Sequence, residues 1–304
     1  MTSADEPWRV APSAASLAWV ARAVGPGARL RANRPLGGGI AQATDALTVE
    51  DRMGRRHRLV LQRWLRPETD GDPGFTPGKE AAVLEIMRTT TVPVPLVVAV
   101  DPDGAASGVP SLLTERVPGR PPSDAACAGP ALLIELGRTL AAIQRVDGGL
   151  ASLVPPYRPF GSLVGLRPPP ASRRPELWEQ ALALASQPAP ASHTTLIHRD
   201  FHPGNSLWEG GRLTGIVDWT STSWGPPAAD LAHLRINLVV RVGAEAADLA
   251  RDAFRDAGGD LAGARHHDLR TVFDFLSDAE LAATHGASLI RLESYLDALL
   301  AGPG

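Results

Sequence analysis

The sequence predicts a two-lobed α+β protein. Short β-type segments separated by glycine turns fill most of the first third of the chain, whereas helical hydrophobic patterns dominate the rest. The run Pro118-Gly-Arg-Pro-Pro marks the change between these two patterns. A chain of 304 residues is long enough for one large domain or two ordinary ones. We therefore expect an N-terminal lobe over residues 1–117 and a C-terminal lobe over residues 118–304.

The N-terminal lobe is predicted to be a small antiparallel sheet with helices. A helix is expected over 13–24, where apolar residues recur at helical spacing behind a serine cap, and another over 78–88. Strand patterns joined by glycine turns or by Asp101-Pro-Asp-Gly lie at 34–40, 45–51, 57–64, 95–100 and 111–117.

The C-terminal lobe is predicted to be mainly helical. Helical patterns lie at 131–146, 176–186, 227–240, 245–257, 268–285 and 287–300. The proline-rich stretch 155–175 between the first two of them is not expected to form regular structure.

Composition excludes several classes of function. The chain has 30 Lys+Arg against 33 Asp+Glu, a formal charge of −3, so it lacks the basic surface that nucleic acid or an anionic membrane requires. The single cysteine, Cys127, excludes an internal disulfide and indicates a buried thiol. The N-terminus does not have the pattern of a signal peptide, and the longest uncharged apolar tract, 89–100, is too short to span a bilayer. We expect a cytoplasmic protein, and no feature indicates an obligate protein partner.

The segment Leu196-Ile-His-Arg-Asp-Phe-His-Pro-Gly-Asn carries the strongest chemical signal. It satisfies H-R-D-x-x-x-x-N, the catalytic-loop pattern of protein kinases, with Asp200 and Asn205 at the two chemical positions. Asp218 follows at the end of the apolar strand Gly215-Ile-Val, where a second metal-holding carboxylate is required. A single Asp or Asn is usually a turn or cap residue, so the joint spacing carries the prediction.

These residue types suit phosphoryl transfer. One carboxylate must lie near the attacking hydroxyl, and hard oxygen ligands must hold Mg²⁺ against the phosphates. Asp200 is predicted to accept or orient the hydroxyl proton. Asn205 and Asp218 are predicted to bind the metal, one through an amide oxygen and the other through a carboxylate.

The motif and its surroundings resemble the aminoglycoside phosphotransferase family of small-molecule kinases, which are related to choline kinase. The resemblance covers about 36–234 and is most specific in HRDFHPGN, in GIVDW, and in the Gly225-Pro226 and Asp230-Leu-Ala segment. It implies a protein-kinase-like fold, an ATP site with Mg²⁺, and transfer of the γ-phosphoryl group to a hydroxyl of a small molecule. By the same resemblance, Asp200 is the base, Asn205 and Asp218 are metal ligands, and Asp230 is structural.

The N-terminal lobe resembles the family's nucleotide site in part. The glycine-rich run that contains Gly38 and Gly39 is similar to the loop whose small residues let backbone N–H groups approach phosphate oxygens. This chain has Ala41-Gln42 where the family commonly has Ser-Asn. Glu80 resembles the helix glutamate that pairs with the phosphate-binding cation, although a solvated helix residue is the alternative interpretation.

The cation itself is missing from the expected position. In Arg58-Leu-Val-Leu-Gln-Arg-Trp, the family's Lys or Arg falls on Gln62. Arg63 is adjacent, but the alternation of a strand points it to the opposite face. Three alternatives follow: a bulge re-aims Arg63, another arginine reaches in, or the nucleotide is held more weakly. We include both Gln62 and Arg63 among the predicted nucleotide-binding residues.

The segment Ser111-Leu-Leu-Thr-Glu-Arg-Val-Pro-Gly is similar to the family's hinge. The resemblance implies that backbone groups of Glu115 and Val117 hydrogen-bond the adenine, with Thr114 behind it.

The acceptor is not fixed by sequence. Aminoglycosides or macrolides are the acceptor class that the family suggests, and the 11 acidic residues against 6 arginines in 241–304 permit a cationic substrate. Solvated helix faces explain the same excess equally well. Trp208, Trp219 and Trp224 are candidates for stacking on a sugar or macrolide ring or for core packing.

Two other functions compete with a small-molecule kinase. Gln62 and the altered glycine loop favour a nucleotide-binding pseudokinase or regulatory protein with little activity. A protein kinase is disfavoured by the short segment between Asp218 and Asp230, which leaves no room for a long activation loop. The choice between ATP and GTP stays open.

Overall fold

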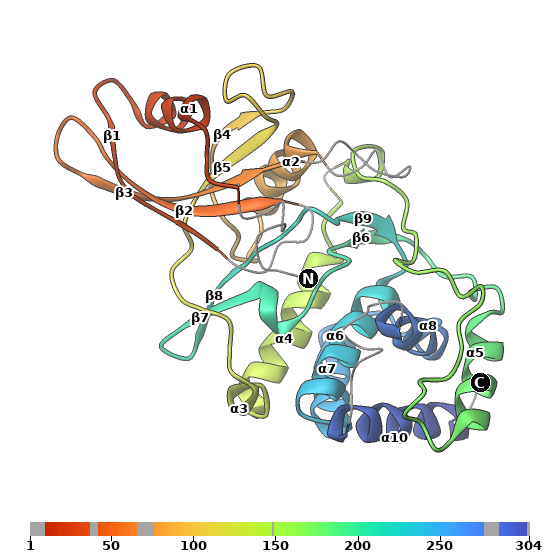
Figure 1. The fold of residues 1–304 in the computed structure, drawn as a ribbon. Coiled ribbons are helices and arrows are strands. Elements are labelled where there is room, and N and C mark those ends of the chain that lie inside the picture. Colours follow the sequence, from red (N-terminus) through yellow and green to blue (C-terminus); the bar gives the residue numbers. More distant parts are fainter. Residues whose placement is uncertain (1–9, 37–41, 66–75, 148, 277–285, 303–304) are drawn as a thin grey trace. The chain divides into compact units, whose positions relative to one another are not determined.

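The computed structural model describes residues 10–36, 42–65, 76–147, 149–276 and 286–302. The chain divides into two compact units (Figure 1). Unit 1 contains 1–118 together with 214–221, and unit 2 contains 119–213 together with 222–304. The division at Pro118 lies one residue from the predicted boundary, but the sequence did not indicate that 214–221 joins the first unit.

Unit 1 is built on a five-stranded antiparallel sheet. The strand order is β1-β2-β3-β5-β4. The strands are β1 (Arg29–Pro35), β2 (Ala43–Glu50), β3 (Arg56–Arg63), β4 (Val97–Asp101) and β5 (Ser111–Glu115). The first strand begins earlier than predicted, and part of its predicted range lies outside the described residues.

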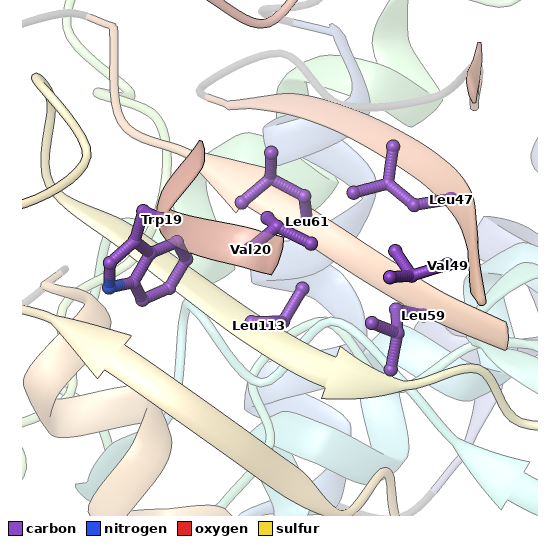
Figure 2. Close-up of a cluster of buried hydrophobic side chains, with 7 residues drawn as sticks. All are labelled: Trp19, Val20, Leu47, Val49, Leu59, Leu61 and Leu113. Atoms are coloured by element: carbon purple, nitrogen blue, oxygen red, sulfur yellow. The ribbon is translucent and has the colours of Figure 1, made fainter. Parts of the chain in front are cut away.

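One face of this sheet packs against helix α1 (Ala14–Val24) to form an apolar core. Trp19 and Val20 of α1 cluster with four leucines and one valine of β2, β3 and β5 (Figure 2). In β3 the buried positions alternate as Leu59, Leu61 and Arg63, as expected when successive side chains point to opposite faces. Burial of each large apolar side chain contributes about 1.5–3 kcal/mol, so this core fixes which face β3 presents to α1.

Gln62 alternates to the other face of β3, where helix α2 (Pro77–Met87) lies. Gln62 donates a hydrogen bond to Glu80 in the first turn of α2, at 3.4 Å. The helix begins at an efficient cap, because Thr76 accepts the backbone N–H of Lys79 and Pro77 occupies the first turn. The sequence prediction of a helix over 78–88 is confirmed.

Unit 2 is mainly helical, as the sequence predicts. Its helices are α3 (Asp124–Cys127), α4 (Pro130–Ile143), α5 (Pro175–Ala185), α6 (Pro227–Arg241), α7 (Ala244–Asp256), α8 (Ala264–Leu276) and α10 (Ala287–Ala301). The segment 155–174 contains neither helix nor strand, as expected from its prolines. Gly137 of α4 permits the close approach of α7, since a Cβ at this position would lie only 2.4 Å from the carbonyl oxygen of Ala250.

Short strands of unit 2 frame the predicted catalytic loop. β6 (Thr195–Ile197) pairs antiparallel with β9 (Ser223–Gly225). β7 (Ser206–Glu209) pairs with β8 (Arg212–Ile216), and the chain passes from unit 2 into unit 1 within β8. Across the described ranges, no helix is both long enough and apolar enough to cross a membrane.

Candidate active site

The predicted catalytic loop follows directly from the buried strand β6. His198, Arg199 and Asp200 come after Ile197, and a single 3₁₀ turn, Pro203–Asn205, leads into β7. This turn is held by His202, whose Nδ1 accepts the backbone N–H of Gly204 at 3.0 Å. The proton of a neutral His202 ring is therefore on Nε2.

Asp230, in the first turn of α6, holds the start of the loop. Its carboxylate accepts the backbone N–H groups of His198 at 2.6 Å and Arg199 at 2.5 Å. Burial raises the pKa of Asp230 to about 7, although both hydrogen bonds act in the opposite direction. Its contacts accord with the structural role that the resemblance implies.

The backbone is strained at one residue of the catalytic loop and at one predicted metal ligand. Among the residues with described coordinates, the non-glycine residues with positive φ are Arg199, at +71°, and Asp218, at +64°. The left-handed region costs a non-glycine residue about 1–3 kcal/mol and persists only where surrounding contacts enforce it. In unit 2 the contact of Asp230 with the Arg199 N–H supplies such enforcement.

The Asp200 carboxylate is held on both oxygens. Asn205 Nδ2 donates to Oδ2 at 2.9 Å and to the Asp200 backbone carbonyl at 3.0 Å. His233 Nε2 lies 3.0 Å from Oδ1, and His202 Nε2 lies 3.6 Å from the same oxygen. The side chain is thus fixed in one orientation while remaining partly exposed.

The charge state of Asp200 follows from these neighbours. Burial disfavours ionisation, but the hydrogen bond and charge of His233 act in the opposite direction and hold the pKa of Asp200 well below its usual range. Burial lowers the pKa of His202 to about 4, so this ring is neutral at pH 7. An ionised Asp200 with a depressed pKa is a weak base that can orient a hydroxyl by accepting its hydrogen bond.

Sequence reasoning did not identify His233. It lies one turn beyond Asp230 on α6, so the helix that anchors the loop also carries the imidazole that contacts Asp200. The only signal available in the sequence was this i, i+3 spacing, which places both residues on one face of the helix.

The amide of Asn205 suits the predicted metal role. Asn205 donates both hydrogen bonds to Asp200 from Nδ2, which leaves its carbonyl oxygen as the atom that can ligate a cation. Within the part of the chain that the structure describes, no group of three or more His, Cys, Asp or Glu residues surrounds a common metal position.

In unit 1, four side chains form a closed ring of hydrogen bonds around the position of the expected cation. Gln62 Nε2 donates to Gln42 at 3.1 Å and to Glu80 at 3.4 Å. Thr220 donates to Glu80 at 2.9 Å and accepts a hydrogen bond from Gln42, which closes the ring. The glutamate that resembles the family's ion-pair residue therefore has neutral partners.

Glu80 is buried, with 4% of its surface exposed. Burial and the nearby charge of Asp218 raise its pKa to about 7, against the hydrogen bonds from Thr220 and Gln62. The structure thus places Asp218 and Glu80 within electrostatic range of each other in unit 1, and it supports the ion-pair position of Glu80 over the solvated alternative.

Arg63 does not replace the missing cation. Its guanidinium is buried on the α1 face of β3, 2.8 Å from the Asp45 carboxylate, and it also donates to the backbone carbonyls of Val10 and Ala11. A bulge in β3 does not re-aim it, since the pairing of β3 with β2 is regular over this stretch. The expectation that Arg63 binds nucleotide is corrected: its partner is Asp45.

The predicted hinge residues lie at the end of β5. The Glu115 N–H donates to the carbonyl of Leu96, so its own carbonyl is the group that an adenine could use. Thr114 is buried beside it. Val117 follows the strand in the same unit, whereas Gly38 and Gly39 lie outside the described residues.

Comparison with known proteins decides the family. The sequence profile of the phosphotransferase enzyme family, designated APH, matches residues 33–268. This chain belongs to that family. No curated protein matches the sequence directly.

Solved structures similar to this phosphotransferase confirm its kinase-like fold. A thermostable mutant of aminoglycoside phosphotransferase APH(4)-Ia, in a ternary complex with AMP-PNP and hygromycin B, shares 18% identity over 96% of this chain and 100% of that one, with a TM-score of 0.61. The macrolide 2'-phosphotransferase MphH from Brachybacterium faecium shares 19% identity over 91% and 96%, with a TM-score of 0.56. A choline/ethanolamine kinase family protein from Mesorhizobium loti shares 18% over 90% and 89%, with a TM-score of 0.54.

The tryptophans of this phosphotransferase divide between core and partly exposed positions. Trp219 is buried and donates its Nε1 proton to the carbonyl of Ile216. Trp208 donates to the Ser206 hydroxyl, and both Trp208 and Trp224 are half-buried. Trp219 therefore serves packing.

Proposed function

We propose that this phosphotransferase moves the γ-phosphoryl group of ATP to a hydroxyl of a small molecule in a reaction that requires Mg²⁺. The observation that carries the proposal is the Asp200 carboxylate, kept ionised and fixed by Asn205 and His233 within a family motif. Among the similar structures, the APH(4)-Ia ternary complex contains AMP-PNP and hygromycin B, which supports a nucleotide donor and a small-molecule acceptor.

In the proposed reaction, Asp200 accepts a hydrogen bond from the acceptor hydroxyl and directs its oxygen at the γ-phosphorus. The new P–O bond forms as the bond to the β,γ-bridging oxygen breaks, and ADP leaves with that oxygen's electron pair. The hydroxyl proton passes to Asp200 late in the step, since the depressed pKa of this carboxylate makes it a weak base. Bound through Asn205 and Asp218, Mg²⁺ would neutralise the charge that develops on the phosphate oxygens.

The nucleotide is proposed to bind through unit 1. The backbone carbonyl of Glu115 and the backbone N–H of Val117 would meet the adenine, with Gly38 and Gly39 at the phosphates. Gln62 lies where related sequences have a cation, and its two Nε2 protons are donated to Gln42 and Glu80. Electrostatic attraction to the phosphates is then weaker, because an amide carries no net charge.

A second function, that of a nucleotide-binding pseudokinase, is favoured by the hydrogen-bond ring around Glu80. The hydrogen-bond ring stabilises Glu80 without any cation, so unit 1 does not need a charged residue at 62 to hold α2 in place. A protein that binds nucleotide without turnover would retain this arrangement.

A coupled ADP-release assay distinguishes an active small-molecule kinase from a pseudokinase. The reaction would contain Mg²⁺, ATP or GTP, and a panel of aminoglycosides, macrolides and amino alcohols. We expect acceptor-dependent turnover that Asp200→Asn lowers by about 10²–10⁴-fold with nucleotide affinity kept, and that Asp218→Ala abolishes. Asp256→Asn, at an exposed acid paired with Arg255, is the matched control. Full turnover by Asp200→Asn would refute the proposed base, and nucleotide binding with no turnover on any acceptor would favour the pseudokinase.

A further inference from the structure

Three aromatic rings of unit 2 lie beside the Asp200 carboxylate. The His233 ring is 5.8 Å from the His202 ring and 6.2 Å from the Phe160 ring, measured between centroids. Both histidines approach Asp200 Oδ1, at 3.0 Å and 3.6 Å. We call this set the aromatic face; its members are Phe160, His202 and His233.

Phe160 is held in place although it is half exposed. The guanidinium carbon of Arg199, a buried residue of the catalytic loop, lies 4.2 Å from the centre of the Phe160 ring. A cation over an aromatic face at this distance is attractive and fixes the ring's orientation. The neighbouring Gly161 is also anchored, because its N–H donates to Asp274 at 3.1 Å and its carbonyl accepts from Arg270. An aromatic side chain that keeps half of its surface in water is thus fixed within the cluster that surrounds the base.

Most of the acidic side chains that the structure describes in the C-terminal region have partners within unit 2. Seven of its carboxylates form ion pairs with arginine or histidine, and Glu293 accepts hydrogen bonds from Ser172 and Trp178. The ion-paired carboxylates are Asp248, Asp252, Asp256, Asp260, Asp268, Asp274 and Asp297. A polycation would have to displace the partners of these eight carboxylates, so they do not by themselves indicate a polycation site.

The charged groups closest to Asp200 also do not favour a polycationic acceptor. Asp200 already has His233, His202 and Asn205 around its carboxylate. Asp274, near the aromatic face, is buried and lies 3.0 Å from Arg270. Recognition of a polyamine requires several carboxylates that are not neutralised, whereas an aromatic face suits the apolar face of a sugar or another ring.

We propose that Phe160, His202 and His233 form the acceptor-binding face of this phosphotransferase, and that it selects a sugar or other ring-bearing alcohol over a polycationic one. This inference rests on the proposed function and names the substrate class of the same site. Phe160 packs against the acceptor ring while the histidines keep Asp200 directed at its hydroxyl.

The test uses acceptors that differ in charge but share rings and hydroxyl groups. Kanamycin and its fully N-acetylated form make one matched pair, and methyl glucoside and erythromycin extend the panel to an uncharged sugar and a single amine. The full-length protein is assayed for ADP release with each acceptor. The variants are Phe160→Ala, Phe160→Leu, and Val164→Ala as the control, because Val164 is a 92% exposed apolar residue of the same segment.

Three probes carry at most one amine: N-acetylated kanamycin, methyl glucoside and erythromycin. We expect the kcat/KM of at least one of them to exceed that of kanamycin by about tenfold or more. Phe160→Ala should raise the acceptor KM about tenfold, Phe160→Leu should raise it less, and neither should change the KM for ATP. Val164→Ala should match the wild type.

Three results would overturn the inference. The first is a preference for kanamycin over its acetylated form, and the second is an acceptor KM that Phe160→Ala does not change. The third is an ATP consumption that requires Asp218 but that none of the three low-charge probes stimulates. In each of these cases the proposed function would survive. Absence of any Asp218-dependent ATP consumption would overturn the proposed function, and the inference with it.

Discussion

Replacing Glu80 with glutamine should stabilise the protein at alkaline pH and leave its stability nearly unchanged at acid pH. Glu80 is buried beside Asp218, and its hydrogen-bond partners Gln62 and Thr220 are neutral. These surroundings raise its pKa from 4.5 to about 7. A rise of this size corresponds to about 3 kcal/mol of unfavourable ionisation in the folded state.

The pH dependence has a definite sign. Below pH 4.5 the carboxyl is protonated in both the folded and the unfolded chain, so its burial carries no ionisation cost. Between pH 4.5 and 7 the unfolded chain releases the proton while the folded chain retains it, and the free energy of unfolding falls. Above pH 7 the full cost of about 3 kcal/mol is present. Glutamine cannot ionise, so the difference in unfolding free energy between Glu80→Gln and the wild type should grow as pH rises.

Urea unfolding at pH 5, 6, 7 and 8, followed by tryptophan fluorescence, measures this difference. Glu85→Gln is the matched control, because Glu85 lies on the same helix, half exposed and paired with Arg88. Its difference from the wild type should stay small and nearly constant with pH. A Glu80→Gln difference that is constant or shrinks from pH 5 to pH 8 would show that Glu80 is not a buried acid with neutral partners.

Three further substitutions test other parts of the structure. Asp230→Asn leaves one oxygen to accept the backbone N–H groups of His198 and Arg199, so it should lower the unfolding free energy by about 1–3 kcal/mol in urea titrations and lower kcat, whereas unchanged values would contradict the anchoring role. Gln62→Lys adds a cation beside Glu80 and should lower the KM for ATP about tenfold in initial-rate assays; an unchanged KM would mean that residue 62 does not face the phosphates. Gly137→Ala places a methyl group against the α7 backbone and should cost about 1–3 kcal/mol in thermal or urea unfolding, and a neutral result would refute the close packing of α4 and α7.

Local patterns in the sequence predicted most of the secondary structure and the catalytic loop. The alternation of Leu59 and Leu61 places them on one face of β3, and it correctly separates Gln62 from Arg63. The H-R-D-x-x-x-x-N spacing identified Asp200 and Asn205, which the structure brings into direct contact, because a short loop fixes both residues within a few positions of each other. Their chemical roles stay predictions.

Long-range contacts were not predictable from these patterns. Asp45 as the partner of Arg63 depends on the register between β2 and β3, which the spacing of apolar residues does not specify. His233 reaches Asp200 because α6 packs against the catalytic loop, and its i, i+3 spacing from Asp230 does not by itself reveal that packing. Gln62 was recognised as a departure from the family pattern, but its neutral partners became visible only once Thr220 was placed beside Glu80.

The discontinuity of unit 1 determines the order in which the protein can be assembled during synthesis. Gln42, Gln62 and Glu80 leave the ribosome early, but the segment 214–221 that completes their unit is made only after residues 119–213. The N–H of Ile216 then pairs with the carbonyl of Pro93, and Thr220 closes the hydrogen-bond ring. Unit 1 is therefore begun first but cannot be completed first. A fragment ending at Pro118 would contain the five-stranded sheet but lack Thr220, the residue that bridges Gln42 and Glu80.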